Sequence, residues 1–334
     1  MRGAAAFALA VSASLLVLGP ASAQQSTTGS APPLVAPAPS LVPGGAPALA
    51  PASGLTPSRA PAAAPAAGGT KSAAKCDNPN ALGVSRTVEI DTTGGPGFGF
   101  EHFKQLDFLR DHEVVLTFDD GPWPTTPAVL KALAAECVKA VFFPIGKHAT
   151  YYPEILKQVA AAGHTIGSHT WSHKDLSTIK SPDEAKAEIE KAVSAVKWAL
   201  GDQGQEAPFF RFPALRHPPE MVTYLGTRNI AIFSTDMDSF DFKMRKPEQV
   251  IKSVMTRLQK HGKGIVLMHD FQKATSEAVP QLLAELKAGG YKIVHMKARG
   301  TVTSLPQYDE ELVKEAKLPT VSTRPVSSVV RDVE

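Results

Sequence analysis

Short apolar runs alternate with longer amphipathic segments over residues 113–294. The runs have the length of buried β-strands, and the segments between them repeat apolar residues with helical spacing. We expect strands at residues 114–116, 140–145, 164–168, 209–212, 230–234, 264–268 and 291–294. We expect helices at residues 125–136, 153–162, 181–200, 219–226, 246–260 and 276–288, the third capped by Ser181. About seven strand–helix units in series indicate an α/β fold whose parallel sheet closes or nearly closes into a barrel.

The first 75 residues lack this periodicity. Residues 1–23 hold one early basic residue, an apolar run and the ending Ala21-Ser22-Ala23, a pattern typical of a cleaved export signal. Residues 24–75 are almost free of charge and contain ten of the chain's 28 prolines, so we expect a disordered Pro/Ala-rich linker. We therefore expect an exported protein, periplasmic or secreted, with no transmembrane segment once the signal is removed.

Residues 76–306 are long enough for one domain with a single core. We expect a C-terminal tail at residues 307–334, with a short helix at residues 309–316. The formal net charge is only +3 over 334 residues, so we expect no nucleic acid or other polyanion as a partner.

The chain has two cysteines, Cys76 and Cys137. After export they would meet an oxidising compartment, which favours a disulfide between them; two separate thiols are the alternative. Neither has a Cys or His neighbour at ligand spacing, so a metal role is less well supported.

Two adjacent carboxylates, Asp119 and Asp120, end the first predicted strand, where Gly121-Pro122 stops it. Neighbouring side chains on a strand point to opposite sides, so the two carboxylates cannot share one role unless the turn rotates one of them. This favours one carboxylate that holds a metal and another that moves protons. An ordinary Asp-Asp-Gly-Pro turn is the alternative.

Three histidines lie at and just beyond the predicted strand at residues 164–168. His169 and His173 are four residues apart, which puts both rings on one side if the segment turns helically. Two imidazoles and one carboxylate form a ligand set for a zinc-like cation, with positions left open for water and substrate. His164 begins the strand, and we expect it to be structural.

Two further polar residues occur at predicted strand ends. Arg211 lies within an apolar strand and needs an anionic partner, which a carboxylate of the Asp pair would supply; a structural ion pair is the alternative. His269 follows an apolar strand at the expected barrel mouth, a suitable place for a general acid. A structural histidine is the alternative there.

Five segments of the chain, taken in order, resemble the five motifs of the polysaccharide deacetylases, the NodB-homology proteins of carbohydrate esterase family 4. The motif segments are residues 117–121, 169–173, 211–213, 238–242 and 267–269. The resemblance implies a distorted (β/α)7 barrel that removes acetyl groups from sugars by metal-assisted hydrolysis. We expect the substrate to be a glycan containing N-acetylglucosamine: chitooligosaccharide, peptidoglycan or poly-N-acetylglucosamine.

The resemblance also implies roles for the motif residues. Asp120, His169 and His173 would bind a divalent metal, usually Zn²⁺. Asp119 would be the general base for the attacking water, and Arg211 would orient it.

On the opposite side, the resemblance implies that His269 protonates the leaving group and that Asp241 tunes this histidine. The substrate-binding residues would be Phe242, Leu267, Pro213 and Ala214. The chain departs from the family pattern in Ala214, where many relatives have Tyr, and in Phe242, where Trp is expected. The run at residues 215–219 also replaces a small polar turn, which puts the sugar specificity in doubt.

Other functions stay open at this point. The same site could act as an O-acetyl esterase on an acetylated xylan-like polysaccharide. A non-catalytic glycan-binding module could keep the barrel, although the presence of every proposed ligand, base and acid argues against it. A cell-wall tether would explain the linker but not the site, and no Gly-x-Ser-x-Gly run supports a serine esterase.

Overall fold

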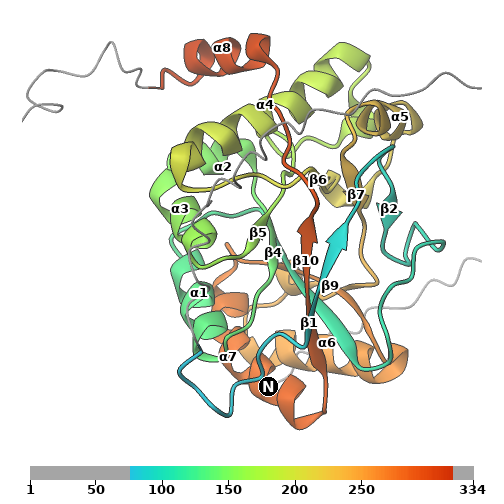
Figure 1. Cartoon of the computed structure of the whole chain (residues 1–334), viewed down its shortest axis with the longest axis vertical. Helices are drawn as coiled ribbons and strands as arrows, with labels where there is room; N and C mark the ends of the chain where they lie inside the picture. The colour runs from blue at the N-terminus through green and yellow to red at the C-terminus, as the bar shows by residue number, and fades with distance from the viewer. Residues whose placement is uncertain (1–75, 319–334) are drawn as a thin grey trace, which may run out of the picture. The chain divides into compact units, whose positions relative to one another are not determined.

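A computed structural model describes residues 76–318 of the chain (Figure 1). The expected signal at residues 1–23, the expected linker at residues 24–75 and residues 319–334 of the expected tail lie outside this part. Over the described residues, no helix combines the length and the apolar character needed to cross a membrane.

The central strand of the fold is β3, Glu113–Asp119, which is buried along its whole length. It pairs in parallel with β9, Gly264–His269, from Val114 opposite Gly264 to Asp119 opposite His269. The other strands of this sheet are β1 Arg86–Ile90, β4 Val141–Phe143, β5 Thr165–Ile166, β8 Met237–Asp238 and β10 Lys292–Ala298. Because every pair is parallel, the carboxyl ends of these strands gather at one end of the sheet.

A smaller parallel sheet continues the wall of the barrel. It contains β2 Gly97–Phe98, β7 Ala231–Phe233 and β6 Phe209–Phe210. A parallel bridge between Ser168 and Phe210 joins β6 to the end of β5. The two sheets form the expected distorted (β/α)7 barrel.

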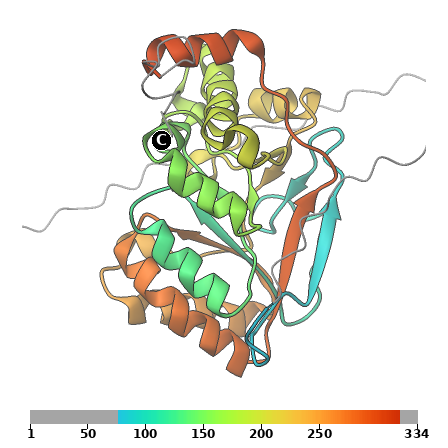
Figure 2. The same cartoon turned by 60° about the vertical axis from the view of Figure 1, so that its left-hand side comes forward.

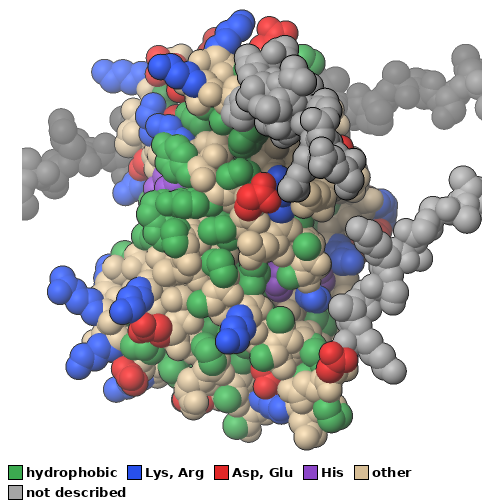
Figure 3. Space-filling model, turned by 90° about the vertical axis from the view of Figure 1, so that its left-hand side faces the viewer, with side chains coloured by type: hydrophobic (Ala, Val, Ile, Leu, Met, Phe, Trp, Pro, Cys, Tyr) green, Lys and Arg blue, Asp and Glu red, His purple; other side chains and the backbone are tan. Residues whose placement is uncertain are grey.

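Helices cover the outside of the sheets (Figure 1; Figure 2). They are α1 Thr126–Ala135, α2 Gly146–Tyr151, α3 Pro153–Ala161, α4 Pro182–Leu200, α5 Pro219–Thr227, α6 Pro247–His261, α7 Lys273–Ala288 and α8 Pro306–Glu315. Ser181 caps α4, as expected, with its Oγ accepting from the N–H of Glu184 at 3.3 Å. On the face at the left of Figure 1, charged side chains of both signs are interspersed around a group of hydrophobic ones (Figure 3).

The predicted strands and helices are present. Strands β4, β5, β6 and β7 are shorter than expected, whereas β3, β9 and β10 are longer. The sequence pattern did not reveal β1, β2, β8 or α2. Two of these strands have only two residues, too few for a period to be visible. The expected helix near the C-terminus is α8, and it packs on α4 through the buried Leu312 and ion pairs from Lys191 to Glu311 and Glu315.

The alternation along β3 directs its side chains to two cores. Val114, Leu116 and Phe118 belong to the cluster shared with residues of α1 and α7. Val115 belongs to a second cluster with residues of β4, β6, β7 and β10. Asp119 is two pleats beyond Val115, so the register brings its carboxylate to the inner side at the carboxyl end of the barrel.

Cys76 and Cys137 are joined by a disulfide, with their Cα atoms 5.8 Å apart. The bond ties the first described residue to the end of α1, and it confirms the expected disulfide. No free cysteine occurs among the described residues.

Candidate active site

Asp119 and Arg211 form a buried ion pair at the end of β3. Arg211 is fully buried and donates through Nη1 to Asp119 Oδ1 at 2.7 Å and to Thr117 Oγ1 at 2.8 Å. Its Nη2 donates to the Ser234 carbonyl at 2.8 Å, and its Cζ lies 4.4 Å from the centroid of the Phe143 ring. These contacts hold the guanidinium in place. Arg211 therefore fixes one carboxylate oxygen of Asp119, and the other oxygen can accept a proton.

The next carboxylate, Asp120, turns toward the same cavity because its backbone enters the left-handed region, with φ of 72°. Aspartate tolerates this conformation better than most residues. The turn thus performs the rotation that two adjacent strand residues need in order to act on one site.

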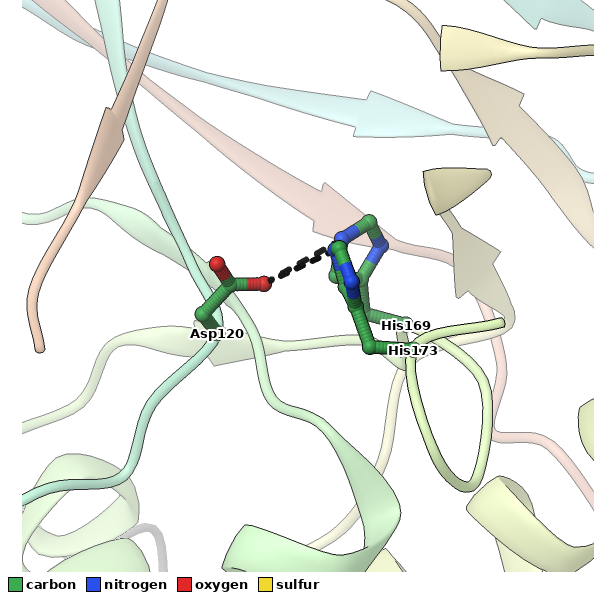
Figure 4. Close-up of side chains that lie close together, drawn as sticks. All are labelled: Asp120, His169 and His173. Atoms are coloured by element: carbon green, nitrogen blue, oxygen red, sulfur yellow. Dashed lines mark ion pairs between the residues drawn. The ribbon is translucent and has the colours of Figure 1, made fainter. Parts of the chain in front are cut away.

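Asp120, His169 and His173 form the only group of three or more potential metal ligands found among residues 76–318 (Figure 4). Asp120 Oδ1 lies 3.4 Å from His169 Nε2 and 3.3 Å from His173 Nε2. The expected helical turn between the histidines is wrong: the segment is a loop in which Thr170 and His173 have φ of 60° and 59°. These two left-handed residues fold the loop back on itself, so both rings still face Asp120.

The protonation pattern of this group fits a cation. Nδ1 of His169 lies 2.7 Å from the Arg211 carbonyl, to which it donates its proton, so Nε2 carries the lone pair. Burial lowers the pKa of His169 well below its usual value, which keeps the ring neutral. The facing Asp120 Oδ1 is buried and has no hydrogen-bond partner among the described residues. Two facing lone pairs repel each other unless a positive centre lies between them, and a divalent metal supplies one.

His269 is held by Asp241 on the other side of the cavity. Its Nδ1 lies 2.6 Å from Asp241 Oδ1, and its backbone N–H donates to Asp241 Oδ2 at 2.7 Å. Thr275 Oγ1 also donates to this second oxygen at 2.5 Å. Asp241 is fully buried, so its charge acts mainly on His269 and leaves Nε2 of that ring toward the cavity.

The environment shifts the pKa values of both candidate proton carriers. Burial raises the pKa of Asp119 to about 6, against the opposing charge of Arg211. Burial would lower the pKa of His269, but the hydrogen bond and charge of Asp241, with Asp120 and Asp119, raise it to about 9. At neutral pH the pair therefore consists of a carboxylate and an imidazolium, a base and an acid.

A cavity of about 600 Å³ joins these groups. Of the residues expected in the site, those that line it are Asp119, Asp120, His169, His173, Ala214, Phe242, Leu267 and His269. Arg211, Asp241 and Pro213 are buried and do not line the cavity. Phe242 is 47% exposed and meets the His269 ring edge to face, with ring centroids 5.6 Å apart.

Seven further lining residues were not expected as site residues. They are Glu101, His102, Phe212, Leu215, Arg216, Asp238 and Phe240. Glu101 and His102 come from the segment after β2, which reaches the cavity because β2 pairs with β7. No local sequence signal marks this segment, since the pairing joins residues more than a hundred positions apart.

The fold and the site together define a NodB-type barrel with a candidate metal centre. The family model described as polysaccharide deacetylase matches residues 109–230. A chitin deacetylase from Colletotrichum lindemuthianum is 30% identical over 195 residues, which cover 54% of this chain and 76% of that protein. Chitin deacetylase 1 from Saccharomyces cerevisiae is 33% identical over 168 residues, or 48% of this chain and 53% of that protein.

Among solved structures, a peptidoglycan deacetylase from Bdellovibrio bacteriovorus aligns with a TM-score of 0.58 and 36% sequence identity, covering 64% of this chain and 59% of that one. The chain belongs to the polysaccharide deacetylase family, a family of hydrolases. It spans about half the length of the yeast relative (53%) and a little more of the Bdellovibrio structure (59%).

Proposed function

We propose that residues 76–306 form an exported, metal-dependent deacetylase domain that hydrolyses N-acetyl groups of N-acetylglucosamine-containing glycans to amine and acetate. The relation between Asp119 and His269 carries the proposal. They are register partners on β3 and β9, so a candidate base and a candidate acid flank the same cavity beside the ligand group. A module that only binds glycans does not need two proton carriers of opposite charge in the same cavity.

Asp119 is the proposed general base. Arg211 occupies its Oδ1, so Oδ2 is available to take a proton from the attacking water. A pKa of about 6 leaves the group ionised at neutral pH and makes it a stronger base than an ordinary aspartate.

Asp120, His169 and His173 are the proposed ligands of a divalent cation, with Zn²⁺ favoured by the donor set. Such a cation, when bound, polarises the acetyl carbonyl and lowers the pKa of water. Ala214, which lines the cavity, is proposed to contribute its backbone N–H to the developing oxyanion.

His269 is the proposed general acid. Its Nδ1 is engaged by Asp241, so the proton on Nε2 is the one available to the leaving group. As the carbon–nitrogen bond breaks, nitrogen takes this proton and leaves as a neutral amine. Hydrolysis of an amide needs such an acid because an amine anion is too basic to depart.

Phe242 and Leu267 are proposed to form the apolar wall around the acetyl methyl group. The chitin and peptidoglycan deacetylases among the relatives support an amino-sugar substrate. The Cys76–Cys137 disulfide supports export, because disulfides persist in oxidising compartments.

The test is acetate release by the metal-loaded protein from N-acetylglucosamine oligomers and from acetylxylan, beside an Asp119→Asn variant. We expect release from the amino sugars, reduced on the order of 100- to 10,000-fold in the variant. Release from acetylxylan alone would support an O-acetyl esterase. Binding of metal and glycan without any release would support a binding module.

A further inference from the structure

A second cavity of about 880 Å³ lies beside the candidate active site. Its lining shares Glu101, Asp238 and Phe240 with the first cavity, so the two hollows meet along one wall. The remaining walls come from the segment after β2, from the start of β8, from helix α6 and from Lys263, which follows that helix. A glycan whose reacting sugar lies at Asp119 and His269 can therefore place its neighbouring sugar in the second cavity.

Most carboxylates of the second cavity are already engaged. Asp107 pairs with Lys263 at 2.5 Å. Asp236 accepts hydrogen bonds from two backbone N–H groups at 2.6 and 2.7 Å, and Asp238 accepts one at 2.8 Å. Glu101 is the only acidic residue of this lining whose side chain makes no hydrogen bond or ion pair within residues 76–318.

Of the four Lys and Arg side chains of the same lining, Lys263 is paired with Asp107, and the other three are less engaged. Arg257 donates through Nη1 to the Ser253 carbonyl at 3.1 Å and to its hydroxyl at 2.6 Å, and its Cζ lies 5.0 Å from the centroid of Phe240. These contacts hold the guanidinium against the shared wall while leaving its other N–H groups for a ligand. Lys104 and Lys260 are exposed, and none of the three cations forms an ion pair within the described residues.

We infer that the second cavity binds the sugar next to the one being deacetylated and selects a sugar that carries a carboxylate, through Arg257, Lys104 and Lys260. The inference rests on the proposed function of the neighbouring site. A fixed guanidinium matches the two oxygens of a carboxylate, and the flexible lysines adapt to its position. Glu101 and Asp238, at the shared wall, repel a carboxylate from the first cavity and so favour this register of the glycan.

The experiment uses two tetrasaccharides that differ in the lactyl groups carried by alternate sugars. One is chitotetraose, and the other alternates N-acetylglucosamine with N-acetylmuramic acid, whose lactyl group adds a carboxylate. The measured quantity is the ratio of kcat/KM for the acidic over the neutral tetrasaccharide. In a Lys104→Glu/Lys260→Glu variant we expect this ratio to fall on the order of tenfold, because the acidic tetrasaccharide loses more kcat/KM than chitotetraose does.

The matched control is Lys131→Glu/Lys252→Glu, which makes the same charge change at exposed helical lysines outside both linings. Its ratio should equal that of the parent. Arg257→Gln should lower the ratio as the first variant does, and added salt should lower it in the parent. A ratio that is the same in all variants, or an equal fall for both substrates, would overturn the inference while leaving the proposed deacetylase intact.

Failure of the proposed function gives a different result, namely no acetate from either tetrasaccharide. Calorimetric titration of the same two tetrasaccharides then decides the inference separately. Tighter binding of the acidic tetrasaccharide by the parent, lost in Lys104→Glu/Lys260→Glu and kept in the control, supports it. Equal binding of the two by the parent refutes it.

Discussion

Arg211 and His169 are joined by a hydrogen bond of 2.7 Å between the arginine carbonyl and Nδ1 of the imidazole. The same arginine binds Asp119 through its guanidinium. One residue thus orients the proposed base through its side chain and sets the tautomer of a proposed metal ligand through its backbone. A side-chain substitution at this position should separate the two effects, because it leaves the carbonyl in place.

We predict that Arg211→Met lowers the free energy of unfolding by about 3–5 kcal/mol, because Asp119 is then buried without its charge partner. Urea denaturation measures this change. The double variant Arg211→Met/Asp119→Asn should lose less stability than the sum of the two single variants, since the neutral amide needs no counter-charge. Strict additivity of the two losses would show that the pair is not coupled.

We predict that Asp241→Asn impairs the proposed acid. The substitution removes the charge that raises the pKa of His269 to about 9, so that pKa should fall. An acid is lost when it deprotonates, and the decline of kcat/KM at high pH should therefore move to lower pH in the variant. The pH profile of acetate release measures the shift. Thr275→Val, which removes only one neutral donor to Asp241, should leave the profile close to that of the parent.

We predict that a chelator abolishes acetate release and lowers the melting temperature, because a cation that binds only the folded site stabilises it by mass action. Zn²⁺ should restore both. Calorimetric titration of the metal-free protein should give one site, and His169→Ala or His173→Ala should each weaken it strongly. His164→Ala is the control, since this buried histidine bonds through Nδ1 to the backbone of Ala140, away from the ligand group. Equal metal affinity in all three variants would contradict the ligand assignment.

We predict an acid-sensitive contribution to stability from Glu113. The hydrogen bond from Arg86 lowers the pKa of this carboxyl to about 2, below its ordinary value of 4.5. The resulting stabilisation is fully present above pH 4.5 and is lost as the pH falls toward 2; for this nearly buried group it is on the order of 1–3 kcal/mol. Glu113→Gln should therefore be destabilising at pH 6 and much less so at pH 2.5 in urea denaturation. Glu154→Gln, with an exposed side chain, should show no such trend.

The sequence predicted the barrel because its strands are buried on both sides and therefore form unbroken apolar runs, as β3 and β9 do. It missed β2 and β8 because two residues cannot show a period. The candidate ligands and proton carriers could be located because ionisable residues directly after buried apolar runs are costly to bury, which marks them as candidates for a functional site. The geometry of these residues could not be predicted. The left-handed residues Thr170 and His173 bring the two histidines together, and no local sequence signal distinguishes that loop from a helical turn.

The contribution of Glu101 and His102 to the cavity was also beyond the sequence. It depends on the pairing of β2 with β7, which is a property of the closed barrel and not of either segment. The same holds for Asp238, which appears as one of several acidic loop residues until β8 pairs with β9 and brings it to the cavity wall.

The disulfide has a mechanical consequence. A pull on the chain from its N-terminal side reaches the folded unit at Cys76, and the covalent bond passes the load directly to Cys137 at the end of α1. Strand β1 follows at Arg86 and, within residues 76–318, pairs only with β10, so it is then outside the path of the force. Without the bond, the same pull would peel this edge strand away one hydrogen bond at a time. The domain can therefore be held from its N-terminal side under tension while the barrel end that carries the candidate site keeps its shape.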